Sequence, residues 1–402
     1  MTPVAPVPIT GLGCLCAAGP DLPACVAALY AGVRVPALPV RFTRDPPVRH
    51  PVFEMPEVLP PARGRHGRAG LSRTSLLALT AAREALEDAG WSPAALRRLR
   101  VGVCVGTTVG SALNNEAFYR AYRAGGRPGM DAIDRFLGTN PAAAVAREHG
   151  LSGPCQTVVN ACSSGTDALG IAASWIRAGV CDVALAGGAD ELCRVTYNGF
   201  ISLMITDEVP CRPFDRSRRG LNLGEGAAML VLEAEPVRFR RARAARAAVL
   251  GYGSACDAHH LTAPHPDGRG LKAAVCEALE TAGVDADRVA FVNAHGTGTP
   301  DNDRVESRAL AEQLPGVPFV STKGYTGHTL GAAGAIEAAF TVACLEQGKI
   351  PANVGFSEPD PELPAAPAAR VTPVTGRVAL SQSLAFGGSN AAVVLGLPAQ
   401  EG

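Results

Sequence analysis

Short apolar segments alternate with helical patterns along most of this chain, and that alternation restricts the fold more than any other feature. The apolar segments cover residues 101–105, 181–186, 227–232, 289–293, 378–383 and 391–395. Strands without a polar face are typical of sheets that are covered by helices on both sides. We therefore predict an α/β fold with mainly parallel, buried strands.

An Arg- and Ala-rich stretch, residues 238–247, divides the chain into two parts that each alternate between strand and helix. Each part has a reactive residue near a predicted helix start, Cys162 in the first and His328 in the second. The two parts share no obvious sequence period, so only their similar alternation of strands and helices indicates a duplication. We predict two duplicated halves, over residues 1–245 and 246–402.

Three local patterns complete the predicted organisation. Residues 74–89 carry leucines and alanines on one side and are followed by Gly90, which indicates an amphipathic helix with a glycine stop. Small residues dominate 330–339, where we expect a second helix. Residues 36–61 are rich in proline and lack periodicity, which predicts an extended surface segment.

The composition argues against several kinds of partner. With 37 basic and 37 acidic residues the formal net charge is zero, so no overall field attracts nucleic acid or an anionic membrane. We find no signal-peptide pattern and no apolar stretch long enough for a bilayer, and we expect a cytoplasmic protein. The 12 cysteines include no C-x-x-C pair, so most are expected to be buried and reduced.

Cys162 has the surroundings of a nucleophile. It follows an apolar run and precedes Ser163, Ser164 and Gly165, small residues that open a predicted helix and leave room for a substrate carbonyl. The free amides of a helix N-terminus favour a thiolate and can hold a developing oxyanion. A cysteine in apolar surroundings is more often structural, so this interpretation needs partners elsewhere in the chain.

Two histidines and a lysine are candidate partners. His295 ends a predicted strand and enters a turn rich in Gly and Thr, where it either meets a ligand or simply satisfies loop carbonyls. His328 precedes a predicted helix, whose dipole disfavours the protonated ring. Lys323 lies five residues before His328, in surroundings too polar for a core position.

These segments together resemble the β-ketoacyl-acyl carrier protein synthases of the thiolase superfamily, whose Cys, His, His triad occurs here in order and spacing. The resemblance extends from Ile9-Thr10-Gly11-Leu12-Gly13 to Phe386-Gly387-Gly388-Ser389-Asn390. Residues 257–264 are most similar to the elongating type II enzymes. The resemblance implies a thiolase-like five-layered αβαβα fold, no metal or redox cofactor, and a homodimer or a heterodimer with a chain-length-factor-like subunit.

The resemblance also implies a mechanism. Cys162 would accept an acyl group from the phosphopantetheine arm of an acyl carrier protein, with the backbone amides of Cys162 and Phe386 as the oxyanion hole. His295 and His328 would stabilise the enolate formed when malonyl-acyl carrier protein loses carbon dioxide. The product would be a 3-oxoacyl-acyl carrier protein in fatty acid, polyketide or polyene biosynthesis.

Further residues receive roles by the same resemblance. Lys323 would pair with Glu306, while Glu337 and Asn390 would form a structural pair able to bind a cation. Phe386 would gate the site, and Ala385, where the family usually has Gly, predicts a stiffer gate. The predicted substrate contacts are Thr297 and Thr299 for the pantetheine arm and Val109 for the acyl pocket. The predicted docking residues for an acidic carrier protein are Arg63, Arg65, Arg68 and Arg127.

Two other classes of function stay open from the sequence. A thiolase or acyltransferase that uses coenzyme A thioesters would transfer acyl groups without decarboxylation. A non-catalytic scaffold subunit is the other alternative. Such a subunit needs no catalytic triad, so the triad in this chain argues against it. The alanine-rich stretch 141–146, where the family often has larger groups in the pocket wall, predicts an acyl chain other than a plain saturated one.

Overall fold

Ten strands form one continuous mixed sheet in the computed structural model, which describes residues 2–42, 49–55, 59–60, 70–108, 115–138 and 140–398. The strand order is β3-β2-β4-β5-β1-β6-β12-β11-β7-β8, and β9 and β10 pair separately. The strands are β1 Val7–Cys16, β2 Val101–Gly106, β3 Cys155–Val158, β4 Val183–Asp190, β5 Gly226–Glu233, β6 Ala247–Cys256, β7 Val289–Asn293, β8 Phe319–Val320, β9 Lys349–Ile350, β10 Thr372–Pro373, β11 Val378–Leu384 and β12 Ser389–Gly396.

Helices cover both faces of the sheet. They are α1 Leu22–Ala31, α2 Arg73–Asp88, α3 Pro93–Leu96, α4 Glu116–Arg123, α5 Asp131–Gly138, α6 Pro141–His149, α7 Ser164–Arg177, α8 Arg194–Ser202, α9 Glu235–Arg240, α10 Arg269–Ala282, α11 Pro300–Gln313, α12 Lys323–Thr326 and α13 Ala333–Gln347. Short 3-10 turns include η2 Ala286–Arg288, η3 Leu330–Ala332 and η4 Phe386–Gly388. Within the described ranges, no helix combines the length and apolar character needed to cross a bilayer.

The two halves of the sheet repeat one topology. From the outer edge inward, the first half has the order β3-β2-β4-β5-β1 and the second half has the order β8-β7-β11-β12-β6. Numbered within each half, and without β9 and β10, both orders are third, second, fourth, fifth and first strand. In both halves the outer two pairings are parallel and the inner two are antiparallel. This repetition confirms the predicted duplication, while the boundary between residues 245 and 246 stays a prediction.

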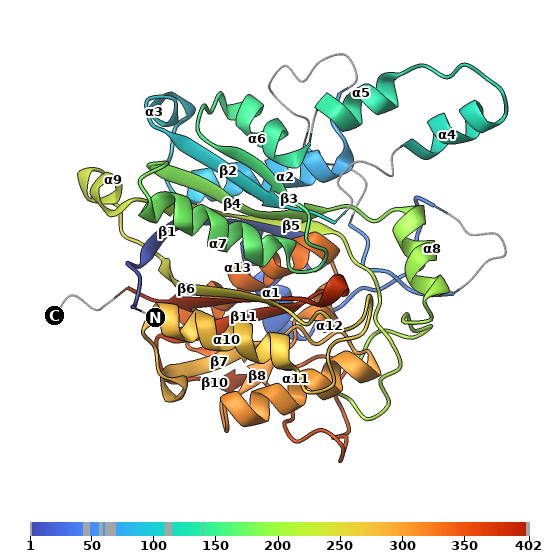
Figure 1. Ribbon diagram of the computed structural model, residues 1–402, viewed down its shortest axis with the longest axis vertical. Helices are drawn as coiled ribbons and strands as arrows, with labels where there is room; N and C mark the ends of the chain where they lie inside the picture. Colours follow the sequence, from blue (N-terminus) through green and yellow to red (C-terminus); the bar gives the residue numbers. More distant parts are fainter. Residues whose placement is uncertain are drawn as a thin grey trace.

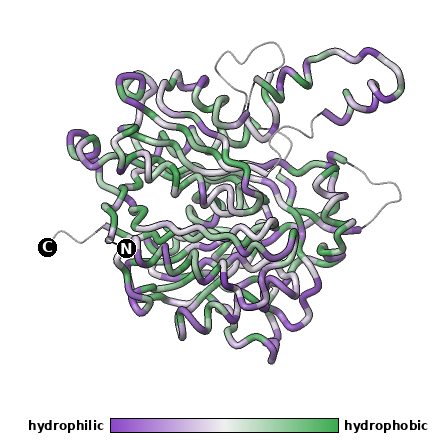
Figure 2. Tube along the Cα trace, viewed as in Figure 1, coloured by the Kyte–Doolittle hydropathy of each residue, from purple (hydrophilic) through white to green (hydrophobic). Residues whose placement is uncertain are grey.

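The duplicated halves stack into five layers (Figure 1). Helix α2 packs on β1 and β5, α7 and α13 lie between the two half-sheets, and α10 packs on β6 and β12. Helix α13 is buried on all sides from Ala333 to Leu345, as expected for a helix held between two apolar faces. Hydrophobic residues accordingly concentrate in the inner strands and central helices (Figure 2). The predicted five-layered αβαβα fold is confirmed.

Two expectations about the fold need correction. The sheet has four parallel and five antiparallel pairings, so it is mixed and not mainly parallel, because the inner strands of each half and the β1–β6 seam run antiparallel. Residues 36–61 are also not simply a surface segment. In their described part, Phe53 is fully buried and pairs with Gly224, and Met55 N–H donates to the buried carboxylate of Glu225.

Candidate active site

The Cys162 turn lies between the end of β3 and the start of α7. Ala161 has a φ of 46°, a left-handed conformation that costs a residue with a Cβ about 1–2 kcal/mol. Ser164 Oγ accepts from Asn160 N–H (2.8 Å) and donates to Ala161 O (2.6 Å), which closes the turn. The turn presents a buried thiol, with Cys162 only 4% exposed, at a sharp change of chain direction.

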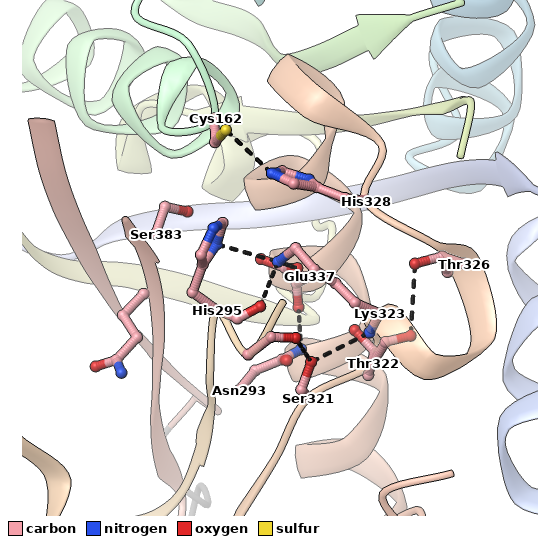
Figure 3. Close-up of polar contacts among 12 residues, drawn as sticks. Cys162, Asn293, His295, Ser321, Thr322, Lys323, Thr326, His328, Glu337 and Ser383 are labelled. Atoms are coloured by element: carbon pink, nitrogen blue, oxygen red, sulfur yellow. Dashed lines mark hydrogen bonds and ion pairs between the residues drawn. The ribbon is translucent and has the colours of Figure 1, made fainter. Parts of the chain in front are cut away.

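His328 faces the thiol from the equivalent connection of the second half, between β8 and η3. Its Nε2 lies 3.0 Å from Cys162 Sγ, and Leu330 N–H donates to its Nδ1 (3.2 Å). A neutral imidazole has one N–H, so an Nδ1 that accepts a hydrogen bond leaves the proton on Nε2. His328 therefore points an N–H donor toward the space beside Cys162 (Figure 3).

His295 is oriented in the same way, but by a lysine. Lys323 Nζ lies 3.1 Å from His295 Nδ1, donates to His295 O (2.6 Å) and forms an ion pair with Glu337. The ammonium can only donate, so His295 also carries its proton on Nε2. The two imidazole rings lie with centroids 5.2 Å apart and planes at 84°.

Both histidines are neutral donors. Burial and the positive charge of Lys323 hold the pKa of His295 and of His328 well below the usual value. Cys162, His295 and His328 bring three ligand atoms within 4.8 Å of one another, which is close enough for a metal ion. A metal would need the lone pair of each Nε2, whereas the donors to Nδ1 place a proton there, so these residues do not fit a metal site.

The predicted pairing of Lys323 with Glu306 is wrong. Lys323, 1% exposed, pairs with Glu337 from the second turn of α13. Glu306 instead supports the turn that carries His295, and burial raises its pKa to about 7. Its carboxylate accepts from His295 N (2.6 Å), Gly296 N (2.7 Å), Gln382 Nε2 (2.7 Å) and Asn302 Nδ2 (3.3 Å).

The structure has no hydrogen bond between Glu337 and Asn390, both of which lie in the described part of the chain. Asn390 Nδ2 donates to Gly388 O (2.9 Å) and so supports the gate loop. Among the described residues, Asn293 Oδ1, Ser381 Oγ and Glu337 Oε2 are buried oxygens without a hydrogen-bond partner. Asn293 donates to Glu337 O and is the register partner of Ser381, and hard cations bind such oxygens. Cation binding by Glu337 and Asn390 stays a prediction.

The gate loop, η4, provides a second donor to the thiol. The Phe386 N–H hydrogen-bonds to Cys162, and the Phe386 ring stacks on Phe200 with centroids 5.6 Å apart and planes at 14°. Ala385 has a φ of −126° and a ψ of 153°, extended backbone that any residue adopts. The loop therefore holds this position without needing a glycine at 385, and the stiffer gate stays a prediction.

Burial dominates the ionisation of Cys162. It raises the pKa of the thiol to about 12, although the Lys323 charge and the Phe386 N–H act in the opposite direction. The expectation that the helix N-terminus favours a resting thiolate is therefore wrong for the free site. Helix α7 begins at Ser164, two residues beyond Cys162, which places the thiol outside the first helical turn.

We predict that alkylation of Cys162 by iodoacetamide accelerates steadily from pH 7 to pH 10, because the reactive thiolate remains a minor species throughout. The measurement is the initial labelling rate of the Cys162 peptide by mass spectrometry. Labelling of the buried Cys344 in the same sample shows whether the protein stays folded across the range, because that thiol becomes accessible only on unfolding. A plateau reached below pH 8 would contradict the raised pKa.

A cavity of about 300 Å³ opens onto the triad. Thr297 and Thr299 line it, with their hydroxyls 2.8 Å apart, and their contact with a pantetheine arm stays a prediction. Cavity residues that sequence reasoning missed are Phe200, Met204, Ile205, Arg219 and Leu221. Phe200, Met204 and Ile205 belong to α8 and the loop after it, a segment whose mixed pattern gives no signal of a site.

The remaining predicted site residues are not brought to the cavity in the described part of the chain. Val109, Arg63, Arg65 and Arg68 lie outside the described residues. Arg127 is exposed in the connection between α4 and α5, which extend away from the body of the molecule (Figure 1), and it does not line the cavity.

A buried thiol that faces two neutral imidazole donors, in a fold of two duplicated halves, defines an acyl-transferring enzyme of the thiolase fold. The family model "Beta-ketoacyl synthase, N-terminal domain" matches residues 4–237, and "Beta-ketoacyl synthase, C-terminal domain" matches residues 246–357. The chain therefore belongs to the β-ketoacyl synthase family, as the sequence motifs indicated.

Three similar proteins place the chain within that family. The tetracenomycin polyketide synthase ketoacyl synthase alpha subunit of Streptomyces glaucescens is 37% identical over 81% of this chain and 81% of its own length. The 3-oxoacyl-[acyl-carrier-protein] synthase 2 of Synechocystis is 33% identical over 80% of each chain. The solved structure of the ishigamide ketosynthase/chain length factor superposes with a TM-score of 0.92 at 32% identity, over 98% of this chain and 99% of that one.

Proposed function

We propose that this enzyme condenses an acyl group held on Cys162 with malonyl-acyl carrier protein, releasing carbon dioxide and forming 3-oxoacyl-acyl carrier protein. One observation carries the proposal: the Nε2–H groups of His295 and His328 point into the space beside the thiol, and both Nδ1 atoms are occupied by donors. Two fixed neutral donors suit an enolate oxygen, whose negative charge develops during decarboxylation.

The first half-reaction transfers the acyl group. Cys162 Sγ attacks the thioester carbonyl, the bond from carbon to the pantetheine sulfur breaks, and the proton of the Cys162 thiol passes to the departing thiolate. The Phe386 N–H, which already reaches Sγ, is placed to donate to the oxyanion of the tetrahedral intermediate. Because burial keeps the resting thiol neutral, only a small fraction of the free enzyme carries the reactive thiolate.

The second half-reaction uses the histidines. The malonyl thioester oxygen lies between the two Nε2–H groups, the bond to the carboxylate carbon breaks, and carbon dioxide departs to leave an enolate. The enolate carbon then attacks the acyl carbonyl on Cys162, the bond from that carbon to Sγ breaks, and the released thiolate takes up one proton from solvent. The lowered pKa of each histidine keeps both rings neutral, so they donate hydrogen bonds at neutral pH without carrying charge of their own.

Carbon dioxide release decides between this reaction and acyl transfer from coenzyme A. The enzyme is first loaded with an acyl group and then given malonyl-acyl carrier protein labelled at the free carboxylate. Labelled carbon dioxide and 3-oxoacyl-acyl carrier protein should appear in equal amounts. Acyl transfer to coenzyme A without carbon dioxide release would favour the thiolase-like alternative instead.

We propose that this chain pairs with a second, chain-length-factor-like subunit. Strand β3 forms the edge of the sheet and exposes Cys155 and Gln156, and Val159 beside it is 65% exposed. Such an edge suits antiparallel pairing with a second chain of the same fold. The ishigamide structure contains a ketosynthase and a chain length factor. Native mass spectrometry of the co-expressed pair distinguishes a heterodimer from a homodimer.

Arg219 is the cation that we propose for docking an acidic carrier protein. Its side chain is 74% exposed and it lines the mouth of the cavity. We predict that Arg219→Glu lowers kcat/KM for the acyl carrier substrate about tenfold at low salt, and less as salt increases, because the contact is a screened surface charge.

Two comparisons make the Arg219 prediction specific. A small N-acetylcysteamine thioester, which has no carrier protein, should react equally well with the Arg219→Glu variant and the original enzyme. Arg127→Glu tests the residue predicted from the sequence, and Arg240→Glu, on α9, serves as a surface-charge control. An equal loss for all three variants would contradict a role particular to Arg219.

A further inference from the structure

The Cys162 turn is held from both sides by one carboxylate. Asp167, in the first turn of α7 and 4% exposed, accepts at Oδ2 from Asn160 Nδ2 (2.6 Å) and from Ser163 Oγ (2.8 Å). Asn160 and Ser163 flank the strained Ala161 and the nucleophile Cys162. Hydrogen bonds to a carboxylate are stronger than neutral ones, so this arrangement can hold a conformation that costs about 1–3 kcal/mol.

The second half of the molecule fixes the same carboxylate. Tyr252, in β6, donates its hydroxyl to Asp167 Oδ1 (2.7 Å). Burial raises the pKa of Tyr252, so the phenol stays protonated and remains a donor. Its ring lies against Gly170, where any added Cβ would come within 2.4 Å of the ring. Asp167 is thus located by contacts from both halves of the chain.

Asn160 continues this network to the gate loop. Its Oδ1 accepts from Ser389 Oγ (2.9 Å), and Ser389 O in turn accepts from Ala385 N (2.7 Å), which closes the loop that contains Phe386. The Phe386 N–H bonds to Cys162. Asn160 therefore bonds both to the residue that holds the nucleophile turn and to the loop that carries the oxyanion donor.

We infer that Asp167 and Asn160 are positioning residues that set the nucleophile turn against the gate loop, so that Cys162 Sγ and the Phe386 N–H reach one substrate carbonyl together. Neither residue lines the cavity, so they act through their neighbours and not on substrate. The inference rests on the proposed function, because the relative placement of thiol and amide matters only for attack on a thioester. Misplacing reacting groups by about 1 Å can cost about 100-fold in rate.

The experiment compares Asp167→Ala, Asp167→Asn and Tyr252→Phe in single-turnover acyl transfer to Cys162. Asp167→Ala should lower the rate about 10- to 100-fold with little change in KM. Asp167→Asn should recover most of that loss, because an amide oxygen still accepts from Asn160 and Ser163. Tyr252→Phe leaves both hydrogen bonds to Asp167 Oδ2 in place, so its acyl-transfer rate should fall less than that of Asp167→Ala. Ser174→Ala, on the same helix, is the matched control.

A double-mutant cycle between Asn160→Ala and Ser389→Ala tests the link to the gate loop. The two effects on the acyl-transfer rate should be clearly non-additive, since both variants remove the same hydrogen bond. Additive effects, or an Asp167→Ala enzyme that unfolds at lower temperature but retains its rate per folded molecule, would overturn the inference.

A chemical readout separates failure of this inference from failure of the proposed function. Iodoacetamide labels Cys162 whether or not the enzyme condenses malonyl groups, and a loosened turn should make labelling faster in Asp167→Ala while acyl transfer becomes slower. If the original enzyme transfers no acyl group at all, the proposed function fails. Unchanged labelling in Asp167→Ala would then overturn the positioning role independently.

Discussion

Replacing Cys162 with Ala should abolish condensation, and replacing it with Gln should abolish condensation while leaving decarboxylation of malonyl-acyl carrier protein. Loss of a nucleophile costs about 10⁴-fold or more in rate. The Gln carboxamide resembles an acyl thioester, and its oxygen can accept the Phe386 N–H that reaches Sγ in the unmodified site. His295 and His328 remain in place, so a malonyl group can still lose carbon dioxide.

The measurement for both variants is carbon dioxide release alongside formation of 3-oxoacyl-acyl carrier protein. Cys276→Ala changes an exposed thiol on α10 and should match the original enzyme in both assays. Retained condensation in Cys162→Ala would remove the thiol from the mechanism. Loss of decarboxylation in Cys162→Gln, in a folded protein, would show that the histidines cannot act on malonyl thioester without the thiol.

The second large effect concerns the buried ion pair below the triad. Lys323→Met should lower the free energy of unfolding by about 3–5 kcal/mol, because it leaves the Glu337 carboxylate buried without a cation. It should also suppress decarboxylation strongly. Without Lys323, no described residue donates to His295 Nδ1, so the ring no longer has to keep its proton on Nε2.

A double-mutant cycle identifies the carboxylate to which Lys323 is coupled. Urea unfolding of Lys323→Met with Glu337→Gln should give a coupling of about 2 kcal/mol or more, whereas coupling with Glu306→Gln should be smaller. The hydrogen bonds in the structure assign the cation to Glu337. A coupling to Glu306 that exceeds the coupling to Glu337 would restore the pairing expected from the family resemblance.

The buried pair of Lys323 and Glu337 predicts how the free energy of unfolding changes with pH. Burial raises the pKa of Glu337 from its ordinary value of 4.5 to about 7, while Lys323 opposes that shift. A carboxyl whose pKa is higher in the folded state contributes stability at low pH and loses it as pH rises through the folded pKa. Removing Lys323 raises that pKa further. The loss of stability in Lys323→Met should therefore extend to higher pH than in the original protein.

Sequence reasoning recovered the chemical groups of the site better than their partners. Cys162, His295 and His328 follow predicted strands or precede predicted helices beside small residues, and the three read together with the family motifs pointed to a site that none of them indicated alone. Glu337 lies in the middle of an apolar helix, an unusual position for a carboxylate that signals a buried partner. The spacing of Lys323 in the sequence could not identify Glu337 as its partner, because the packing of α13 alone brings that carboxylate to the lysine.

The fold was predictable to a similar extent. Apolar strands and helical stretches gave the layers, but strand direction depends on which segments become neighbours at the centre of the sheet, and apolar composition carries no information about that choice. The hydrogen bonds around Asp167 could not be predicted from the sequence either, because they too depend on which segments become neighbours. The residues that form them, Asn160, Ser389 and Tyr252, come from segments far apart in the chain, and each is an ordinary polar residue in its local context.

The matching positions of Cys162 and His328 have a consequence for how the site is assembled. Each follows the third strand of its half and precedes a central helix, so the same connection carries a thiol in one half and an imidazole donor in the other. Under the proposed mechanism turnover needs both groups, so it requires the two halves to be folded and packed together. Turnover can then serve as a measure of complete folding.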